Sequence, residues 1–66
     1  MTDFERNIMI YAIEMYMENA VMKNYRTCMR LAREGCLSNE DKMDMLSCAN
    51  HWVVTHNACE DILRSL

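Results

Sequence analysis

Residues 2–34 read TDFERNIMIYAIEMYMENAVMKNYRTCMRLARE and contain neither proline nor glycine. Thr2 and Glu5 have the spacing of a capping box, in which each side chain accepts a hydrogen bond from the backbone N–H of the other residue. Gly35 is the single glycine of the chain, and glycine is favoured just past a helix C-terminus. These signals predict one long helix over about residues 3–34.

Apolar side chains recur along this helix in alternating steps of three and four residues, which places them on one seam. The seam consists of Phe4, Ile8, Tyr11, Met15, Met22, Tyr25, Met29 and Ala32. Beside it lies a second apolar row with Met9, Ile13, Tyr16, Ala20 and Leu31. At about 100° per residue, the apolar sectors of the two halves are centred roughly 90° or more apart. We therefore expect the helix to bend or break near Glu18–Asn19, or each half to pack against a different neighbour.

A second helix is predicted over about residues 39–65, after a turn at 35–38. Ser38 is a favoured N-cap residue, and the carboxylates of Glu40 and Asp41 suit the positive end of the helix dipole. Its apolar seam contains Met45, Ala49, Trp52, His56, Cys59, Leu63 and Leu66. The β-branched residues at 53–55 lower helix propensity. A break near residues 54–57 is therefore the alternative to one continuous helix.

Two long helices joined by a tight turn predict an all-α fold, an antiparallel helical hairpin that forms a single domain over residues 1–66. A chain of 66 residues buries a core of marginal size unless a partner, a metal or a disulfide adds to it. We expect two hairpins to dimerise into a helical bundle. The expected dimer and core anchors are Phe4, Ile8, Tyr11, Met15, Met22, Tyr25, Met29, Met45, Ala49, Trp52, Cys59 and Leu63.

The net charge of −3 argues against nucleic-acid binding driven by overall charge. Its distribution is uneven, since residues 1–18 carry −3, residues 19–34 carry +3 and residues 35–66 carry −3. Lys23, Arg26, Arg30 and Arg33 recur at helical spacing and form one basic stripe. This stripe is interpreted either as a solvated helix face or as a contact for phosphates or for a partner protein.

Cysteine and histidine recur in a C-x2-H-x4-H-x2-C pattern formed by Cys48, His51, His56 and Cys59. Thiolate and imidazole are ligands that zinc prefers. On one continuous helix, however, Cys48 and Cys59 are roughly 16 Å apart, at about 1.5 Å per residue. One chain then closes a site only if the helix breaks. We expect no metal and no cofactor, and a zinc-stabilised module is the third alternative.

The N-terminal residues do not resemble a signal peptide, because Asp3, Glu5 and Arg6 stand where such a peptide needs a cationic start and an uninterrupted apolar segment. The apolar stretch 8–17 is too short for a membrane span and contains Glu14. Four cysteines without an export signal favour reduced thiols. We expect a cytoplasmic protein with no membrane partner.

The whole chain, from Met1-Thr2-Asp3-Phe4-Glu5 to Ile62-Leu63-Arg64-Ser65-Leu66, resembles the short all-helical accessory proteins encoded in the early regions of temperate phages. That resemblance implies a non-enzymatic protein in the host cytoplasm. The expected architecture is also similar to that of the Rop family of plasmid regulators, which are dimers of helical hairpins that bind RNA.

Catalysis is not expected, because the sequence offers no glycine-rich loop, no paired carboxylates and no oxyanion site. We predict a small helical homodimer that acts as a protein-interaction or regulatory accessory factor on an unidentified protein. An RNA- or DNA-binding regulator that uses the basic stripe is the alternative.

Overall fold

The computed structural model describes residues 1–34 and 37–66. Its elements are α1 (Asp3–Tyr16), the π-helical turn η1 (Met17–Met22), α2 (Lys23–Arg33) and α3 (Asn39–Ser65). No strand occurs among the described residues, which confirms the expected all-α class. The glycine stop expected at Gly35 lies outside the described residues. None of the helices in the described ranges is long and apolar enough to cross a lipid bilayer.

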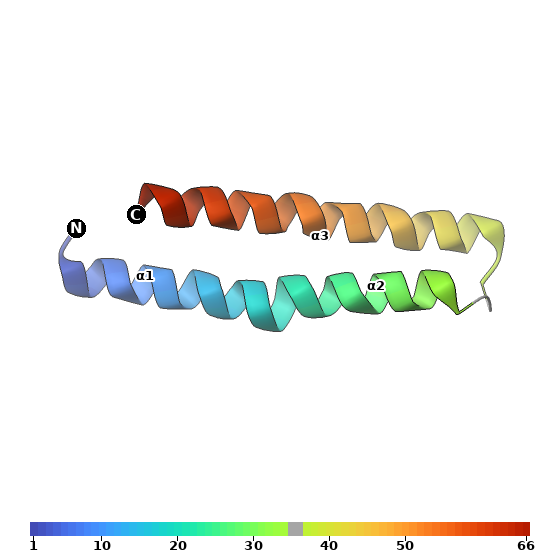
Figure 1. Cartoon of the computed structure of the whole chain (residues 1–66), viewed down its shortest axis with the longest axis horizontal. Coiled ribbons are helices and arrows are strands. Elements are labelled where there is room, and N and C mark those ends of the chain that lie inside the picture. The colour runs from blue at the N-terminus through green and yellow to red at the C-terminus, as the bar shows by residue number, and fades with distance from the viewer. Residues whose placement is uncertain (35–36) are drawn as a thin grey trace.

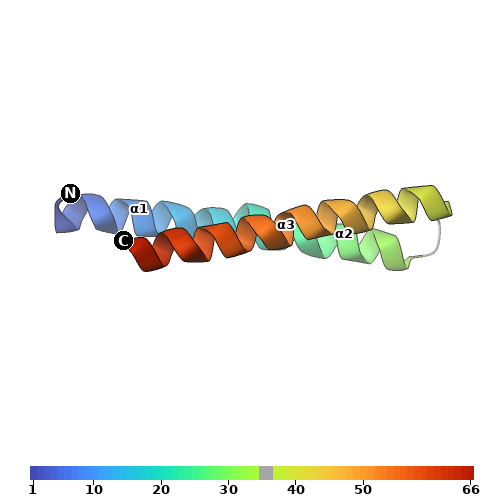
Figure 2. The ribbon, with the colours of Figure 1, turned by 90° about the horizontal axis from the view of Figure 1, so that it is seen from above.

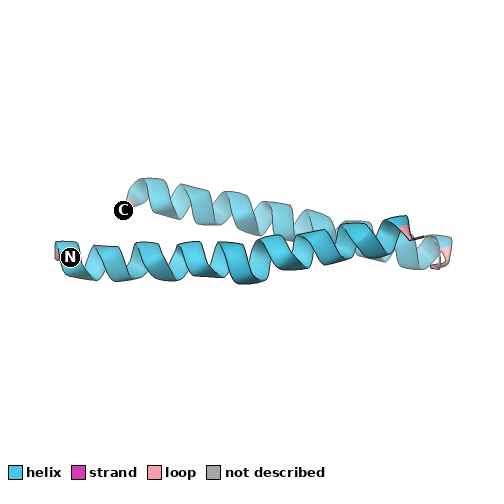
Figure 3. Ribbon diagram, turned by 60° about the horizontal axis from the view of Figure 1, so that its bottom comes forward, coloured by secondary structure: helices cyan, strands magenta, loops and turns pink. Residues whose placement is uncertain are grey.

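The chain forms two helical arms that run in opposite directions (Figure 1). The first arm consists of α1, η1 and α2 in succession, and the second arm is α3. Helix α3 packs mostly on α2 and η1 and only slightly on α1. The arms cross near the middle of the molecule (Figure 2) and diverge toward the two termini (Figure 3). Helix α1 is therefore the part of the first arm that α3 covers least.

Side-chain caps fix the start of both arms. The Thr2 hydroxyl accepts from the Glu5 backbone N–H at 3.1 Å, and the Glu5 carboxylate accepts from the Thr2 backbone N–H at 2.9 Å. This is the capping box that the spacing predicts. The Ser38 hydroxyl accepts from the Asp41 backbone N–H at 3.1 Å. Such caps satisfy N–H groups that have no acceptor within the first turn of a helix.

Helix α3 is continuous from Asn39 to Ser65, so the alternative of a break near residues 54–57 is not adopted. The Thr55 hydroxyl donates to the His51 carbonyl at 2.9 Å, within the helix itself. Val54 is exposed, whereas Trp52 and His56 are partly buried against the first arm. Packing of one face thus outweighs the weak helix propensity of the β-branched residues.

The irregularity expected near Glu18–Asn19 takes the form of the π turn η1. A π turn closes with i→i+5 hydrogen bonds and therefore holds one residue more than an α-helical turn. A strict heptad pattern of alternating steps of three and four would continue the row of α1 that faces α3 at residues 20, 24, 27 and 31. The observed row lies one residue later at each of these positions. The resulting inner row, whose members are partly or fully buried, is Ile10, Ile13, Met17, Val21, Tyr25, Cys28 and Ala32.

This one-residue shift corrects the expected seam of the first arm. The α1 members Phe4, Ile8, Tyr11 and Met15 are 74%, 53%, 67% and 38% exposed. Tyr11 lies two residues before Ile13, which is about 200° around the helix, so it faces away from α3. These four side chains therefore lie outside the face that packs on α3, as the expected difference between the two halves of the helix allows. Their role as dimer anchors stays a prediction.

The remaining expected anchors lie between the arms, but the fully buried core is small. Met22, Tyr25, Met29, Met45, Trp52 and Leu63 are partly buried, and Ala49 and Cys59 are buried. Among the described residues the buried apolar side chains are Val21, Ala49 and Cys59, with exposed fractions of 0%, 3% and 7%. A molecule with dimensions of 51 × 16 × 10 Å is one helix layer thick. Such a layer leaves most apolar side chains in contact with water.

Candidate interaction surface

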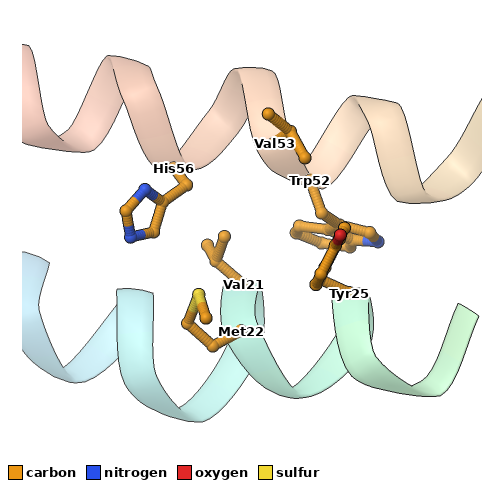
Figure 4. A pocket seen from close by; sticks show the side chains of 6 residues that line it. All are labelled: Val21, Met22, Tyr25, Trp52, Val53 and His56. Carbon is orange, nitrogen blue, oxygen red and sulfur yellow. The ribbon is translucent and has the colours of Figure 1, made fainter. Parts of the chain in front are cut away.

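A hollow of about 210 Å³ lies between the arms at the π turn. Its walls are almost entirely apolar and come from η1, α2 and α3. Tyr25 and Trp52 lie at one end of the hollow and His56 at the other, with Val21 between them (Figure 4). Met22 and Val53 complete the lining. Val21 of η1 is fully buried at this hollow, and its neighbour Met22 is partly buried.

His56 carries the polar edge of this central hollow. Its Nδ1 lies 3.5 Å from Oε1 of Glu60, one turn further along α3, and forms an ion pair when the imidazole is protonated. Glu60 is also 3.6 Å from the guanidinium of Arg64, which lies 2.9 Å from Asp61. These contacts hold the charged groups along α3 and leave the floor of the hollow apolar.

A second, more open hollow of about 350 Å³ lies next to the first and shares Met22 with it. Glu14, Glu18 and Arg26 line it together with Met17, Met22 and Leu63. Two carboxylates and one guanidinium therefore meet beside the middle of the first arm, on the same side as the central hollow.

The four exposed side chains of α1, namely Phe4, Ile8, Tyr11 and Met15, form an apolar row. Ile8, Tyr11 and Met15 each lie two residues before a member of the inner row, and Phe4 lies one helical turn before Ile8. An offset of two residues corresponds to about 200° of rotation. The apolar row thus lies on the back of the first arm, opposite α3, where no other part of the described chain covers it.

The basic stripe lies on the exposed side of α2, and its member Arg26 reaches the flank of the arm, where it lines the second hollow with Leu63 of α3. Lys23, Arg26 and Arg30 lie two residues before Tyr25, Cys28 and Ala32 of the inner row, and Arg33 continues the stripe. All four side chains are exposed. Two of them make local contacts: Arg30 lies 3.7 Å from Glu34, and the Arg33 Nε donates to the Met29 carbonyl at 3.3 Å. The prediction of a single basic face on this helix agrees with these positions.

The π turn joins the apolar row and the basic stripe into one continuous feature, which we call the outer ridge. Its members are Phe4, Ile8, Tyr11, Met15, Asn19, Lys23, Arg26, Arg30 and Arg33, all exposed. A strict heptad pattern would continue the apolar row at residues 22, 25, 29 and 32. These four side chains are partly buried, and the exposed positions that follow the row are the cations.

The four side chains considered as zinc ligands are not brought together. They lie on one continuous helix, where Cys48 and His51 are exposed, His56 is partly buried and Cys59 is buried. In residues 1–34 and 37–66, no group of three or more His, Cys, Asp or Glu side chains could hold a metal ion. His51 instead makes an edge contact with the Trp52 ring, with ring centroids 5.2 Å apart.

Sequence reasoning missed Val21, the one side chain that is fully buried among the described residues. A signal for it exists in the spacing. The row Ile10, Ile13 and Met17 continues at Val21 by an ordinary helical step of four residues. Following this row past Met17 would have identified Val21 as a core residue.

The chain matches no protein-family model, no curated protein and no solved structure. The resemblances to phage accessory proteins and to Rop regulators therefore stay predictions. The function is inferred from the surface of this chain alone.

Proposed function

We propose that the chain is a small non-enzymatic helical protein that forms a homodimer and acts by binding another macromolecule, as a protein-interaction or regulatory accessory factor. The two arms form one helical hairpin, and two hairpins assemble into a bundle. The same proposal places the protein in a reducing cytoplasm. If it is phage-encoded, as the resemblance implies, its target is a host protein.

The observation that carries this proposal is the imbalance between buried and exposed apolar side chains. Three apolar residues are buried in the described chain, while Phe4, Tyr11 and Met43 are 74%, 67% and 64% exposed. Complete burial of one such side chain is worth about 1.5–3 kcal/mol. A chain of this size has little stability to spare. A partner surface that covers these side chains therefore stabilises the fold and gives the exposed row a function.

Light scattering across a dilution series of the reduced protein tests the dimer. We expect a mass of twice the 7.8 kDa chain that persists to low micromolar concentration. Circular dichroism on the same samples reports whether the helices remain folded. A helical protein whose mass equals one chain at every concentration would contradict the homodimer.

Nucleic-acid binding is the second candidate, and the exposed basic half of the outer ridge favours it. Cations at helical spacing on one rigid face can contact successive phosphates. Reversing the charge of Arg26 and Arg30 together separates the two functions. Nucleic-acid binding would collapse in this variant, whereas binding of a protein through apolar side chains would survive.

A further inference from the structure

We propose that a second copy of this chain covers the outer ridge, with the two first arms antiparallel and related by a two-fold axis near Asn19. This inference rests on the homodimer proposed above and specifies its geometry. The apolar half of each ridge then lies on the basic half of the other. Each chain contributes the same surface, as a two-fold interface requires.

The spacing of the ridge is symmetric about Asn19. Met15 and Lys23 lie four residues to either side of it, and Ile8 and Arg30 lie eleven residues to either side. Tyr11 and Arg26 lie at eight and seven residues. An antiparallel copy centred there therefore places every apolar member opposite a cationic one. The expected contacts are Met15 with Lys23, Tyr11 with Arg26, Ile8 with Arg30 and Phe4 with Arg33, each made twice.

The chemistry of these contacts is favourable for long cationic side chains. Arginine and lysine can lay their aliphatic stems on apolar surface while the charged groups stay at its edge. A guanidinium over the ring of Tyr11 or Phe4 also gains a cation–π interaction. The carboxylates of Glu14 and Glu18, which line the hollow beside the ridge with Arg26, lie where the partner's cations emerge.

Net charge selects the antiparallel orientation. Residues 1–18 carry −3 and residues 19–34 carry +3, so antiparallel first arms place opposite charges along the whole contact. Parallel arms would place Lys23, Arg26 and Arg30 against the same residues of the partner. Like charges held at short distance across an interface oppose association.

Interface size disfavours a dimer made by the apolar rows alone. Residues 4–15 span roughly 17 Å, whereas residues 4–33 span roughly 44 Å, at about 1.5 Å per residue. Stable interfaces bury about 800 Å² on each partner. The complete ridge offers more than twice the length of the apolar row for such a contact.

Two charge-reversed variants test the geometry. The first carries Lys23→Glu and Arg26→Glu, and the second carries Glu14→Lys and Glu18→Lys. In an antiparallel dimer of either variant, residues 1–18 of one chain and residues 19–34 of the other carry charges of the same sign. We expect association to weaken about tenfold or more at low salt, because the two-fold axis repeats every altered contact. A variant with Lys42→Glu and Arg64→Glu makes the same net charge change as the first variant, but on α3, and should dimerise like the wild type.

Mixing the two variants in equal amounts is the decisive experiment. The mixed dimer has opposite charges at both halves of the contact, so native mass spectrometry should show it in excess over either homodimer. Sedimentation should give an affinity within about threefold of wild type, since each ion pair is restored across the interface. Restoration in trans cannot come from contacts within one chain. Wild-type association should also weaken as salt rises.

Three results would overturn the proposal. Variants that self-associate as tightly as the wild type would show that the dimer exists but does not use the antiparallel ridge. A wild-type protein that stays monomeric at low salt would remove the dimer itself. Monomers that bind a labelled single-stranded oligonucleotide, and lose it on Lys23→Glu and Arg26→Glu, would assign the ridge to nucleic acid.

Discussion

Val21 shows at the scale of single residues how little of this chain is fully enclosed. It is 0% exposed and lies between Tyr25, Trp52 and His56 at the π turn. Val54 has the same side chain on α3 but is 59% exposed. The two valines therefore separate the effect of burial from the effect of helix propensity.

Val21→Ala should lower the free energy of unfolding by about 2 kcal/mol, because it removes two methyl groups at about 0.8 kcal/mol each and enlarges the adjacent hollow. Val54→Ala should leave it unchanged or raise it by a few tenths of a kcal/mol, since alanine is the better helix former. Urea unfolding at one fixed protein concentration measures both. Equal effects of the two substitutions would show that Val21 is not enclosed as described.

Glu5 belongs to the capping box at the start of α1. The pKa of its carboxyl is held below the ordinary value of 4.5, first by the hydrogen bond from the Thr2 backbone N–H and then by the Thr2 side chain. A lowered pKa in the folded state stabilises the helix start above pH 4.5. That contribution is lost as the pH falls through the folded-state pKa.

A carboxyl chemical-shift titration should therefore place the Glu5 midpoint below 4.5. Thr2→Val keeps the backbone N–H and should move the midpoint only part of the way back. Thr2→Pro removes that N–H as well and should restore the ordinary midpoint. An unchanged midpoint in Thr2→Pro would contradict the capping box as the cause of the shift.

At the scale of elements, local signals could be read from the sequence but the register could not. The caps at Thr2 and Ser38 involve neighbours three residues apart, so spacing alone identifies them. The partly buried positions of Trp52 and Leu63 follow from the regular period of α3. The first arm has the same period in each half, but a single inserted residue rotates one half against the other. Propensity does not reveal that residue, because Glu18, Asn19 and Ala20 are all compatible with an α-helix.

The π turn decides which side chains the first arm presents. Without it, Met22, Tyr25 and Met29 would continue the row of Phe4 and Tyr11. With it, Tyr25 turns toward α3 and the cations of α2 extend the apolar row. The candidate surface could be predicted from the sequence only in its two halves, an apolar seam and a basic stripe. Whether the apolar seam and the basic stripe form one surface depends on tertiary packing, which the spacing of residues in one helix does not reveal.

The whole molecule is two crossed arms that enclose only a small core among the described residues. Helix α3 covers α2 and η1 more than α1, so the least covered helix is also the one that carries Phe4, Ile8 and Tyr11 on its back. A second layer is the simplest way to remove these side chains from water. The proposed dimer supplies that layer and pairs opposite charges at the same time.

The arrangement of both arms rests on the claim that η1 contains one residue beyond a regular helix. Deleting Asn19, which is exposed, would return η1 to the i→i+4 pattern of a regular helix and keep both halves of the first arm on α3. Deleting Asn57, an exposed residue of the continuous helix α3, would instead rotate the end of that helix by about 100°. The two deletions remove the same amino acid and differ only in the turn that loses it.

Thermal unfolding of the two deletion variants beside the wild type, at equal protein concentration and followed by circular dichroism, tests this claim most directly. We predict that the protein without Asn19 melts at or above the wild-type temperature. The protein without Asn57 should melt about 10 °C lower or more, because 1 kcal/mol shifts Tm by roughly 4–8 °C in a domain of this size. Loss of Asn19 that destabilises the protein as much as loss of Asn57 would contradict the inserted residue and the ridge that depends on it.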